Sequence, residues 1–98
     1  MITKQQVYEQ LKTVMDPELH VDIVSLGLIY EIVNTDKKIK IIMTLTTPGC
    51  PLAPEIDRLV REALKPLGTF EIELELVWEP AWSKERMSEE AMLKLGMI

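Results

Sequence analysis

The chain has 98 residues, a single cysteine and no long apolar run, and each shortage excludes a class of protein. One cysteine forms no disulfide within the chain, so nothing in the sequence requires an oxidising compartment. No apolar stretch approaches the roughly 20 residues that a membrane-spanning helix needs. The first ten residues, MITKQQVYEQ, are polar from the start and lack the apolar centre of a signal peptide. We therefore expect a cytoplasmic protein with no membrane partner.

Positive charge is also scarce. Eleven lysines and arginines stand against 16 aspartates and glutamates, which gives a net charge of -5. Such a chain repels the phosphates of nucleic acids, so we expect no nucleic-acid partner. The sequence contains no HExxH, CxxC, GxGxxG or P-loop pattern. A zinc site made only of cysteine and histidine within one chain is excluded as well, because there is one of each.

Hydrophobic periodicity divides the chain into six elements. The expected helices cover residues 3–15, 52–65 and 88–95, and the expected strands cover residues 28–34, 39–46 and 70–78. Thr3 and Gln6 resemble a capping box at the start of the first helix, and Ser88 is the expected cap of the last helix. A short polar turn joins the first two strands, which predicts a hairpin.

The third predicted strand, FEIELELVW, alternates strictly between apolar residues and glutamates. Such alternation indicates one buried and one solvent-facing side, so the helices must cover the opposite side from Glu71, Glu73 and Glu75. We predict a single domain over residues 1–98 of the α+β class, with two layers and the order α-β-β-α-β-α. Its three-stranded sheet is mixed, because the second and third strands flank a helix that makes a right-handed crossover.

The one cysteine, Cys50, lies in the stretch TLTTPGCPLAPEI, where a strand pattern stops and a helix pattern starts. Ligands of α/β units usually bind at such a junction. A helix N-terminus also favours an anion, so we expect Cys50 to be a reactive thiol with a lowered pKa. The alternative is a packed cysteine, since free cysteines are among the most buried residue types.

Other polar side chains are candidates for the same site. Asp16 and Glu18 flank Pro17, and such a pair binds a metal, serves as acid and base, or only caps a turn. Thr46 and Thr47 offer hydroxyl groups close to Cys50 in the sequence. His20, the only histidine, follows in the same loop as the two carboxylates and is the only imidazole base for a thiol-dependent enzyme.

Both tryptophans lie in the segment VWEPAWSKERMS, four residues apart. We expect Trp78 and Trp82 mainly to hold the fold or a dimer together. The alternative is a surface that binds a partner, because tryptophan is enriched in interface hot spots.

Taken in order, DPEL, DIVSLGLIY, TLTTPGCP and VWEPAWSKERMSEEAMLKLGM resemble the small iron–sulfur maturation family that includes SufT and PaaD-like proteins. The resemblance implies an α+β domain related to iron–sulfur cluster assembly domains, often dimeric. It also places the family's motif residues at Asp16, Glu18, Thr46, Thr47 and Cys50. Of these, Cys50, Asp16 and Glu18 are the implied metal ligands.

The family often has glycine or proline where this chain has His20, which leaves open whether His20 is an additional ligand. A proline pair before the second tryptophan is replaced here by Pro80-Ala81.

The single thiol limits what such a protein does with a cluster. Clusters usually take four protein ligands, mostly thiolates, and a homodimer supplies two. We therefore expect no permanently bound cofactor, but a transient iron–sulfur cluster or iron shared across a homodimer or with a partner. The expected function is an accessory factor, more an assembly or carrier factor than an enzyme, whose partners are iron–sulfur assembly proteins and apo-client proteins. The alternatives are a PaaD-like assembly partner of a multicomponent oxygenase and a thiol-dependent enzyme.

Overall fold

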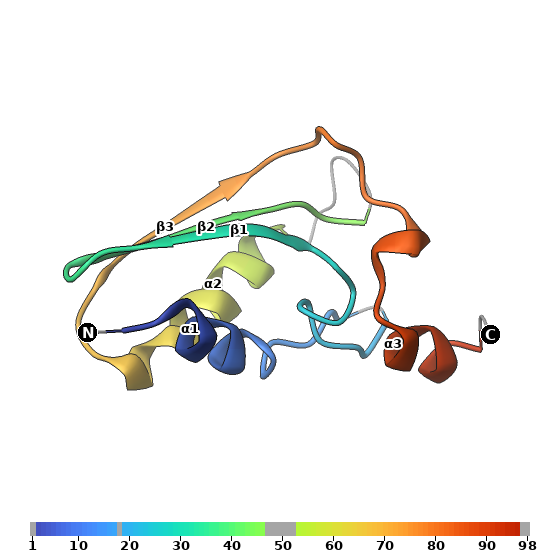
Figure 1. Cartoon of the computed structure of the whole chain (residues 1–98), viewed down its shortest axis with the longest axis horizontal. Coiled ribbons are helices and arrows are strands. Elements are labelled where there is room, and N and C mark those ends of the chain that lie inside the picture. The colour runs from blue at the N-terminus through green and yellow to red at the C-terminus, as the bar shows by residue number, and fades with distance from the viewer. Residues whose placement is uncertain (1, 18, 47–52, 97–98) are drawn as a thin grey trace.

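A three-stranded sheet forms one layer of the protein and helices form the other (Figure 1). The computed structural model describes residues 2–17, 19–46 and 53–96. The elements along the chain are α1 (Lys4–Leu11), β1 (Ile29–Asn34), β2 (Lys38–Met43), α2 (Ala53–Leu64), β3 (Glu71–Leu76) and α3 (Glu89–Lys94), with short 3-10 helices at η1 (Lys65–Leu67) and η2 (Lys84–Arg86). The predicted order α-β-β-α-β-α and the α+β class are confirmed. No helix in the described part of the chain is long and apolar enough to cross a membrane.

The sheet has the order β1-β2-β3. β1 pairs antiparallel with β2, and β2 pairs parallel with β3, so the sheet is mixed as predicted. On the solvent face the three glutamates of β3 lie beside two lysines of β2. The Nζ of Lys38 is 2.7 Å from Oε1 of Glu73, and the Nζ of Lys40 is 3.2 Å from Oε1 of Glu75. The predicted wet face of β3 is therefore confirmed, and no helix of the described chain covers it (Figure 1).

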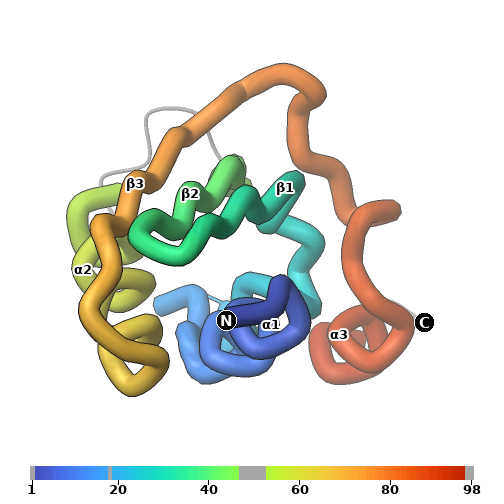
Figure 2. The backbone as a smooth tube through the Cα atoms, turned by 60° about the vertical axis from the view of Figure 1, so that its left-hand side comes forward, coloured from blue at the N-terminus to red at the C-terminus, as the bar shows by residue number. Residues whose placement is uncertain are grey.

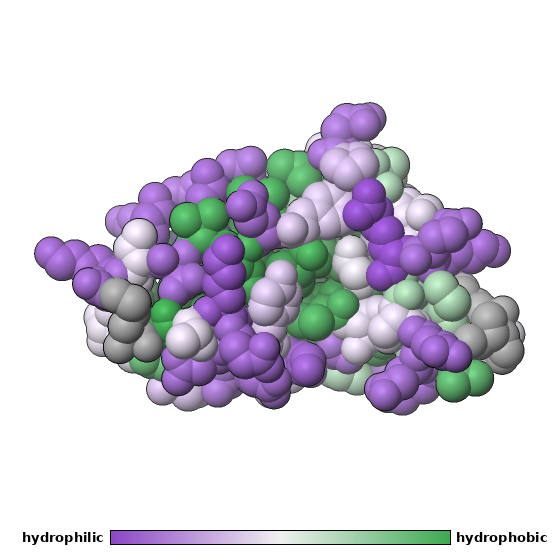
Figure 3. All heavy atoms as spheres, in the orientation of Figure 1, coloured by the Kyte–Doolittle hydropathy of each residue, from purple (hydrophilic) through white to green (hydrophobic). Residues whose placement is uncertain are grey.

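The hydrophobic core lies between the sheet and the helix layer. Ile39, Ile41 and Met43 on the inner face of β2 are fully buried. They face α1 and α2, which bury the side chains of Val7, Leu11, Ile56, Val60 and Leu64. Figure 2 shows α2 below the β3 side of the sheet and α1 closer to β1. On the face drawn in Figure 3, hydrophobic residues are visible mainly between the two layers, and hydrophilic residues surround them.

The first helix is shorter than the predicted range of 3–15, and the contacts of its last predicted residues explain why. Its start is as expected, because Thr3 and Gln6 form a capping box. The helix ends at Leu11, since the backbone of Val14 is used elsewhere: its carbonyl accepts a hydrogen bond from the amide of Ile23 at 3.0 Å. A tertiary pairing of the segments around residues 14–16 and 21–23 has replaced the last helical turn.

The last helix packs beside the connector that leads into β1. Ser88 caps α3 by accepting a hydrogen bond from the amide of Ala91, as its position in the sequence predicted. The amide of Ser88 donates to the carbonyl of Ser25, and Ala91 is buried. α3 therefore extends the helix layer beyond the sheet, as Figure 1 shows at its right-hand end.

Candidate functional site

The sequence predicts the candidate site at the junction of β2 and α2, at the end of the sheet where the parallel strands β2 and β3 stop. Cys50 and Thr47 lie outside the described residues, as does Glu18, so their predicted places in the site stay predictions. Thr46 is described and half-buried, beyond the end of β2. On the other side of the gap α2 begins at Ala53. The described residues before the gap therefore follow the end of a strand, and those after it start a helix, in the order that the sequence indicated. The strand itself ends at Met43, before the predicted residue 46.

Thr44 has a structural role at the end of the sheet. It is fully buried, and its amide donates to the carbonyl of Leu28 at 2.9 Å. Its hydroxyl group lies 3.5 Å from the carbonyl of Leu45. These contacts extend the pairing of β1 and β2 beyond their ends and fix the direction in which the chain leaves β2.

Asp16 organises the loop that contains it. Its side chain is buried, at 7% exposure, and Oδ1 accepts a hydrogen bond from the amide of Leu19 at 2.9 Å. Its carbonyl accepts from the amide of His20, and its amide donates to the carbonyl of Val21. The turn-capping role that Asp-Pro favours is therefore present, and one carboxylate oxygen is engaged in it. A metal-binding role for Asp16 stays a prediction.

His20 is solvent-exposed and has a φ of 57°. Positive φ is uncommon for residues other than glycine, and histidine is among the types that tolerate it better than most. The exposed position agrees with a solvated loop histidine. Within the described ranges, no group of three or more histidine, cysteine, aspartate or glutamate side chains is arranged to hold a metal ion.

An open hollow of about 340 Å³ lies between the first half of α2 and β3. Its walls are the side chains of Ala53, Pro54, Asp57, Arg61, Leu74 and Leu76. Nε of Arg61 donates to Oδ1 of Asp57 at 2.9 Å, so a paired cation and anion line a largely apolar space. No pattern in the sequence indicated this hollow. The sequence indicated only the ion pair, because Asp57 and Arg61 are four residues apart on a predicted helix.

The first turn of α2 carries an ionised carboxylate. The side chain of Arg58 donates hydrogen bonds to Glu55, and these hold the pKa of Glu55 below its ordinary value. The pair is solvent-exposed, so its effect is screened by water and salt. A negative charge at a helix N-terminus is favourable to the helix, but it opposes a thiolate near the same helix start.

The two tryptophans have different environments, which the sequence did not separate. The indole N–H of Trp82 donates to the buried carbonyl of Leu26 at 2.6 Å. Trp78 is 40% exposed and is one of the exposed large hydrophobic residues of the protein. Trp82 therefore contributes to the fold as predicted, whereas Trp78 is more exposed than a residue that mainly holds the fold.

Comparison with known proteins gives consistent matches. A family described as iron–sulfur cluster assembly protein matches residues 4–74. The chain is 42% identical to the Fe-S protein maturation auxiliary factor of Porphyromonas gingivalis, over 98% of this chain and 93% of that protein. It is 44% identical to the auxiliary factor YitW of Bacillus subtilis, over 96% of this chain and 94% of that protein. The crystal structure of a domain of unknown function, DUF59, from Bacillus anthracis superposes with a TM-score of 0.90 at 43% identity, and the match covers 97% of this chain and 92% of that one.

Two other matches belong to longer proteins. The chain is 42% identical, over 66% of its length, to an iron–sulfur cluster carrier protein of Deinococcus radiodurans, of which it covers 19%. It is also 28% identical to a protein of Escherichia coli named as a putative component of 1,2-phenylacetyl-CoA epoxidase, over 92% of this chain and 55% of that protein.

Proposed function

The chain belongs to the family of iron–sulfur cluster assembly proteins, and on that premise we propose that it is an accessory factor in the maturation of iron–sulfur proteins, acting through Cys50. The observation that carries the proposal is the similarity, over nearly the whole chain, to proteins named as Fe-S protein maturation auxiliary factors. The whole chain acts as one assembly domain, in the cytoplasm. Its partners are the proteins that build clusters and the apo-proteins that receive them.

In this proposal the cluster is cargo. One thiol per chain is too few for a stable all-cysteine site, which usually has four thiolate ligands. A transient complex with a second copy or with a partner supplies the remaining ligands. Asp16, Glu18, Thr46 and Thr47 are the proposed neighbours of Cys50, with the two carboxylates as additional iron ligands. The chain then carries or positions a cluster, and no substrate is turned over.

Anaerobic reconstitution with iron and sulfide tests this role of Cys50. We expect the wild-type protein to gain cluster absorption and to form a species of higher mass, and the variant Cys50→Ser to gain neither. Ser83→Ala is the control, because it removes an exposed hydroxyl group from a residue outside the proposed site, and we expect it to load as the wild type does. Equal iron and sulfide uptake by wild type and Cys50→Ser would overturn the proposal.

The pH dependence of alkylation tests the thiol in the metal-free protein. A free cysteine has a pKa of about 8.5, and a helix N-terminus lowers it. We expect alkylation to become half-maximal below that pH. A Cys50 that resists alkylation in the folded protein is a packed cysteine, and the maturation role would then depend on partner contacts alone.

A second candidate function is assembly of a multicomponent oxygenase. The similarity to the putative epoxidase component of Escherichia coli favours it, although identity there is lower and the chain covers about half of that protein. Co-purification separates the two roles: oxygenase components bound to this chain would support the second, and cluster-assembly proteins the first.

A further inference from the structure

The outer edge of β3 has backbone groups that no strand of the described chain pairs with. β3 is last in the order β1-β2-β3. The amides of Glu71 and Val77 donate to carbonyls on the β2 side at 2.9 Å. Because successive residues of a strand direct their backbone groups to opposite sides, Leu74 and Leu76 direct theirs away from β2. The carbonyl of Ile72 confirms this direction, since it accepts a hydrogen bond from Nη1 of Arg61 at 2.8 Å.

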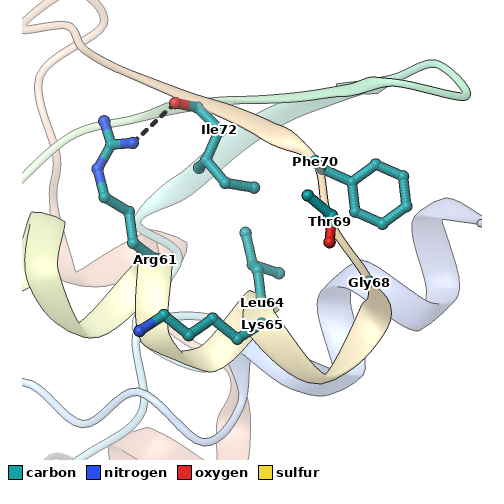
Figure 4. A pocket seen from close by; sticks show the side chains of 7 residues that line it. All are labelled: Arg61, Leu64, Lys65, Gly68, Thr69, Phe70 and Ile72. Atoms are coloured by element: carbon teal, nitrogen blue, oxygen red, sulfur yellow. Dashed lines mark hydrogen bonds between the residues drawn. The ribbon is translucent and has the colours of Figure 1, made fainter.

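Two hollows lie along this edge, on either side of Arg61. The first is the hollow of about 340 Å³ next to Leu74 and Leu76. The second has about 360 Å³ and is lined by Arg61, Leu64, Lys65, Gly68, Thr69, Phe70 and Ile72. In Figure 4 Arg61 extends from α2 to the carbonyl of Ile72, and the side chains of Leu64 and Ile72 point towards one another. The seam between α2 and β3 is therefore a shallow apolar groove that Arg61 divides.

The inner-face residues of β3 are left partly uncovered by this arrangement. Ile39, Ile41 and Met43 of β2 are fully buried, whereas their neighbours Ile72, Leu74 and Leu76 on β3 are only half-buried. The helix layer thus leaves the inner face of the last strand incompletely covered. A fourth strand beside β3 would complete the burial of these side chains, and burial of apolar surface is favourable.

The solvent face of the sheet is acidic. Glu71, Glu73 and Glu75 lie on β3, and Glu31 lies in the same row as Glu75 on the other edge strand. Lys38 and Lys40 are the basic residues that pair with the β3 glutamates. Four glutamates against two lysines leave this face with a charge of −2. Glu71, with 75% of its side chain exposed, lies 3.6 Å from Lys38.

This charge pattern disfavours a second copy of the chain as the occupant. Strands paired edge to edge keep their solvent faces on the same side, so β3 beside another β3 would place glutamates opposite glutamates. Like charges in directly opposite positions are destabilising. A strand with basic residues on the solvent face has the complementary charge instead.

We propose that the edge of β3 binds an extended segment of another protein as a fourth strand, in which lysine or arginine alternates with apolar residues. Its backbone pairs with Leu74 and Leu76, its basic side chains lie beside Glu73 and Glu75, and its apolar side chains enter the hollow between α2 and β3. Recognition by strand addition takes affinity from main-chain hydrogen bonds and specificity from alternate side chains. The inference goes beyond the proposed function, because it needs neither Cys50 nor a cluster.

Arg61 sets the length of the paired segment. Its hydrogen bond occupies the carbonyl of Ile72, and its ion pair with Asp57 keeps it across the groove. The added strand therefore pairs with the half of β3 that ends at Leu76. Arg61→Met removes this barrier, and we expect the protected region to extend to Ile72 in the complex.

Amide hydrogen exchange with a synthetic peptide tests the proposal. The probe is a seven-residue peptide in which lysine and valine alternate, acetylated at its start and amidated at its end. We expect the amides of Leu74 and Leu76 to exchange readily in the free protein and about tenfold or more slowly with the peptide bound. The amides of Glu73 and Glu75 bond to β2 in both states and should change little.

Two N-methylated versions of the peptide provide a backbone control. One carries methyl groups on the backbone nitrogens of its lysines, and the other carries them on the backbone nitrogens of its valines. The side chains are unchanged. An added strand directs every second amide towards β3, so one version should lose binding and the other should keep it. Equal binding by both versions would overturn strand addition.

Charge reversal provides the side-chain control. We expect Glu75→Lys to weaken binding of the lysine–valine peptide about threefold to fivefold and to strengthen binding of a glutamate–valine peptide. Glu62→Lys changes the net charge equally from an exposed position on α2 and should have no such effect. Equal effects of the two variants would show that net charge alone determines the binding, and would overturn the proposal.

Two outcomes would also overturn it directly. One is a lack of protection at Leu74 and Leu76 at any peptide concentration at which other amides respond. The other is protection of both amides without peptide in a protein that runs as a dimer, because a second copy would then occupy the edge.

Discussion

The two edges of the sheet are held in very different ways. Beside β1, the hydroxyl of Tyr30 donates to the carbonyl of Pro80 at 2.7 Å, and the side-chain amide of Asn34 donates to the carbonyl of Ile2 at 2.6 Å. The guanidinium of Arg86 also lies 4.6 Å from the centre of the Tyr30 ring. Beside β3, Arg61 makes the one side-chain hydrogen bond to the strand backbone found in the described chain. The protein therefore secures the β1 side with both its N-terminal residues and its C-terminal third, whereas no strand of the described chain lies beside the β3 edge.

The largest expected effect comes from Gly27, where the C-terminal segment meets the connector. Its φ is 76°, and a Cβ atom there would lie 2.2 Å from the carbonyl oxygen of Arg86. Because the obstacle is backbone, Gly27→Ala must displace the segment around η2. We expect the free energy of unfolding to fall by about 3 kcal/mol or more, measured by urea denaturation.

Gly96 is the matched control for this change. It has a similar φ of 74°, but a Cβ atom there meets nothing within 4 Å. Gly96→Ala should cost about 1–2 kcal/mol, the strain of the left-handed conformation alone. Equal losses at Gly27 and Gly96 would show that strain, and not the close approach to Arg86, determines the effect.

A smaller loss is expected for Trp82→Phe. The substitution keeps an aromatic ring but removes the N–H group that bonds to the carbonyl of Leu26. Leu26 is fully buried, so its carbonyl would lose a partner away from solvent. The expected cost is about 1–3 kcal/mol in thermal or urea unfolding.

Trp78→Phe shows whether the two tryptophans differ in stability as they do in exposure. Trp78 is 40% exposed, so its replacement should change stability by about 0.5 kcal/mol or less. A loss at Trp78 as large as that at Trp82 would indicate that the exposed ring is covered in solution, for example by a second copy.

The smallest expected effect is a change in the pKa of Glu73, on the solvent-facing side of the sheet. The hydrogen bond from Lys38 lowers the pKa of Glu73 below its ordinary value, and Lys40 adds to the shift. A carboxylate with a lowered pKa stabilises the fold above the pKa of the unfolded chain, and this contribution is lost as the pH falls through the folded value. We expect Lys38→Met to raise the midpoint of the Glu73 carboxyl titration, followed by NMR, and to leave stability unchanged below that range.

The control for this titration is Lys37→Met, which removes the same charge one position earlier. The pKa of Glu73 should then stay low, because the hydrogen bonds from Lys38 and Lys40 remain. High salt should also reduce the shift in the wild-type protein, since both partners are exposed.

The sequence predicted those elements whose pattern is local. The alternation in β3 determined which side faces solvent, and Thr3 and Ser88 marked where α1 and α3 begin. Errors occurred where contacts distant in sequence replaced local preference. α1 ends early because Val14 pairs with Ile23.

The candidate site was predictable only in part. Asp-Pro correctly predicted a turn in which Asp16 caps Leu19. The difference between Trp78 and Trp82 was not visible, because it depends on where the carbonyl of Leu26 lies in the folded protein. The hollow next to Leu74 was missed for the same reason, since it forms only when α2 crosses to β3.

The position of both tryptophans also determines what the intrinsic fluorescence of this protein reports during folding. Neither indole belongs to the sheet, and the contact between Trp82 and Leu26 joins residues 56 positions apart. Contacts of such long sequence separation are slow to form, because closing the intervening chain costs entropy. A fluorescence trace will therefore follow the docking of the C-terminal segment, whereas far-ultraviolet circular dichroism follows the helices and strands. A stopped-flow experiment with both signals will time the two events separately.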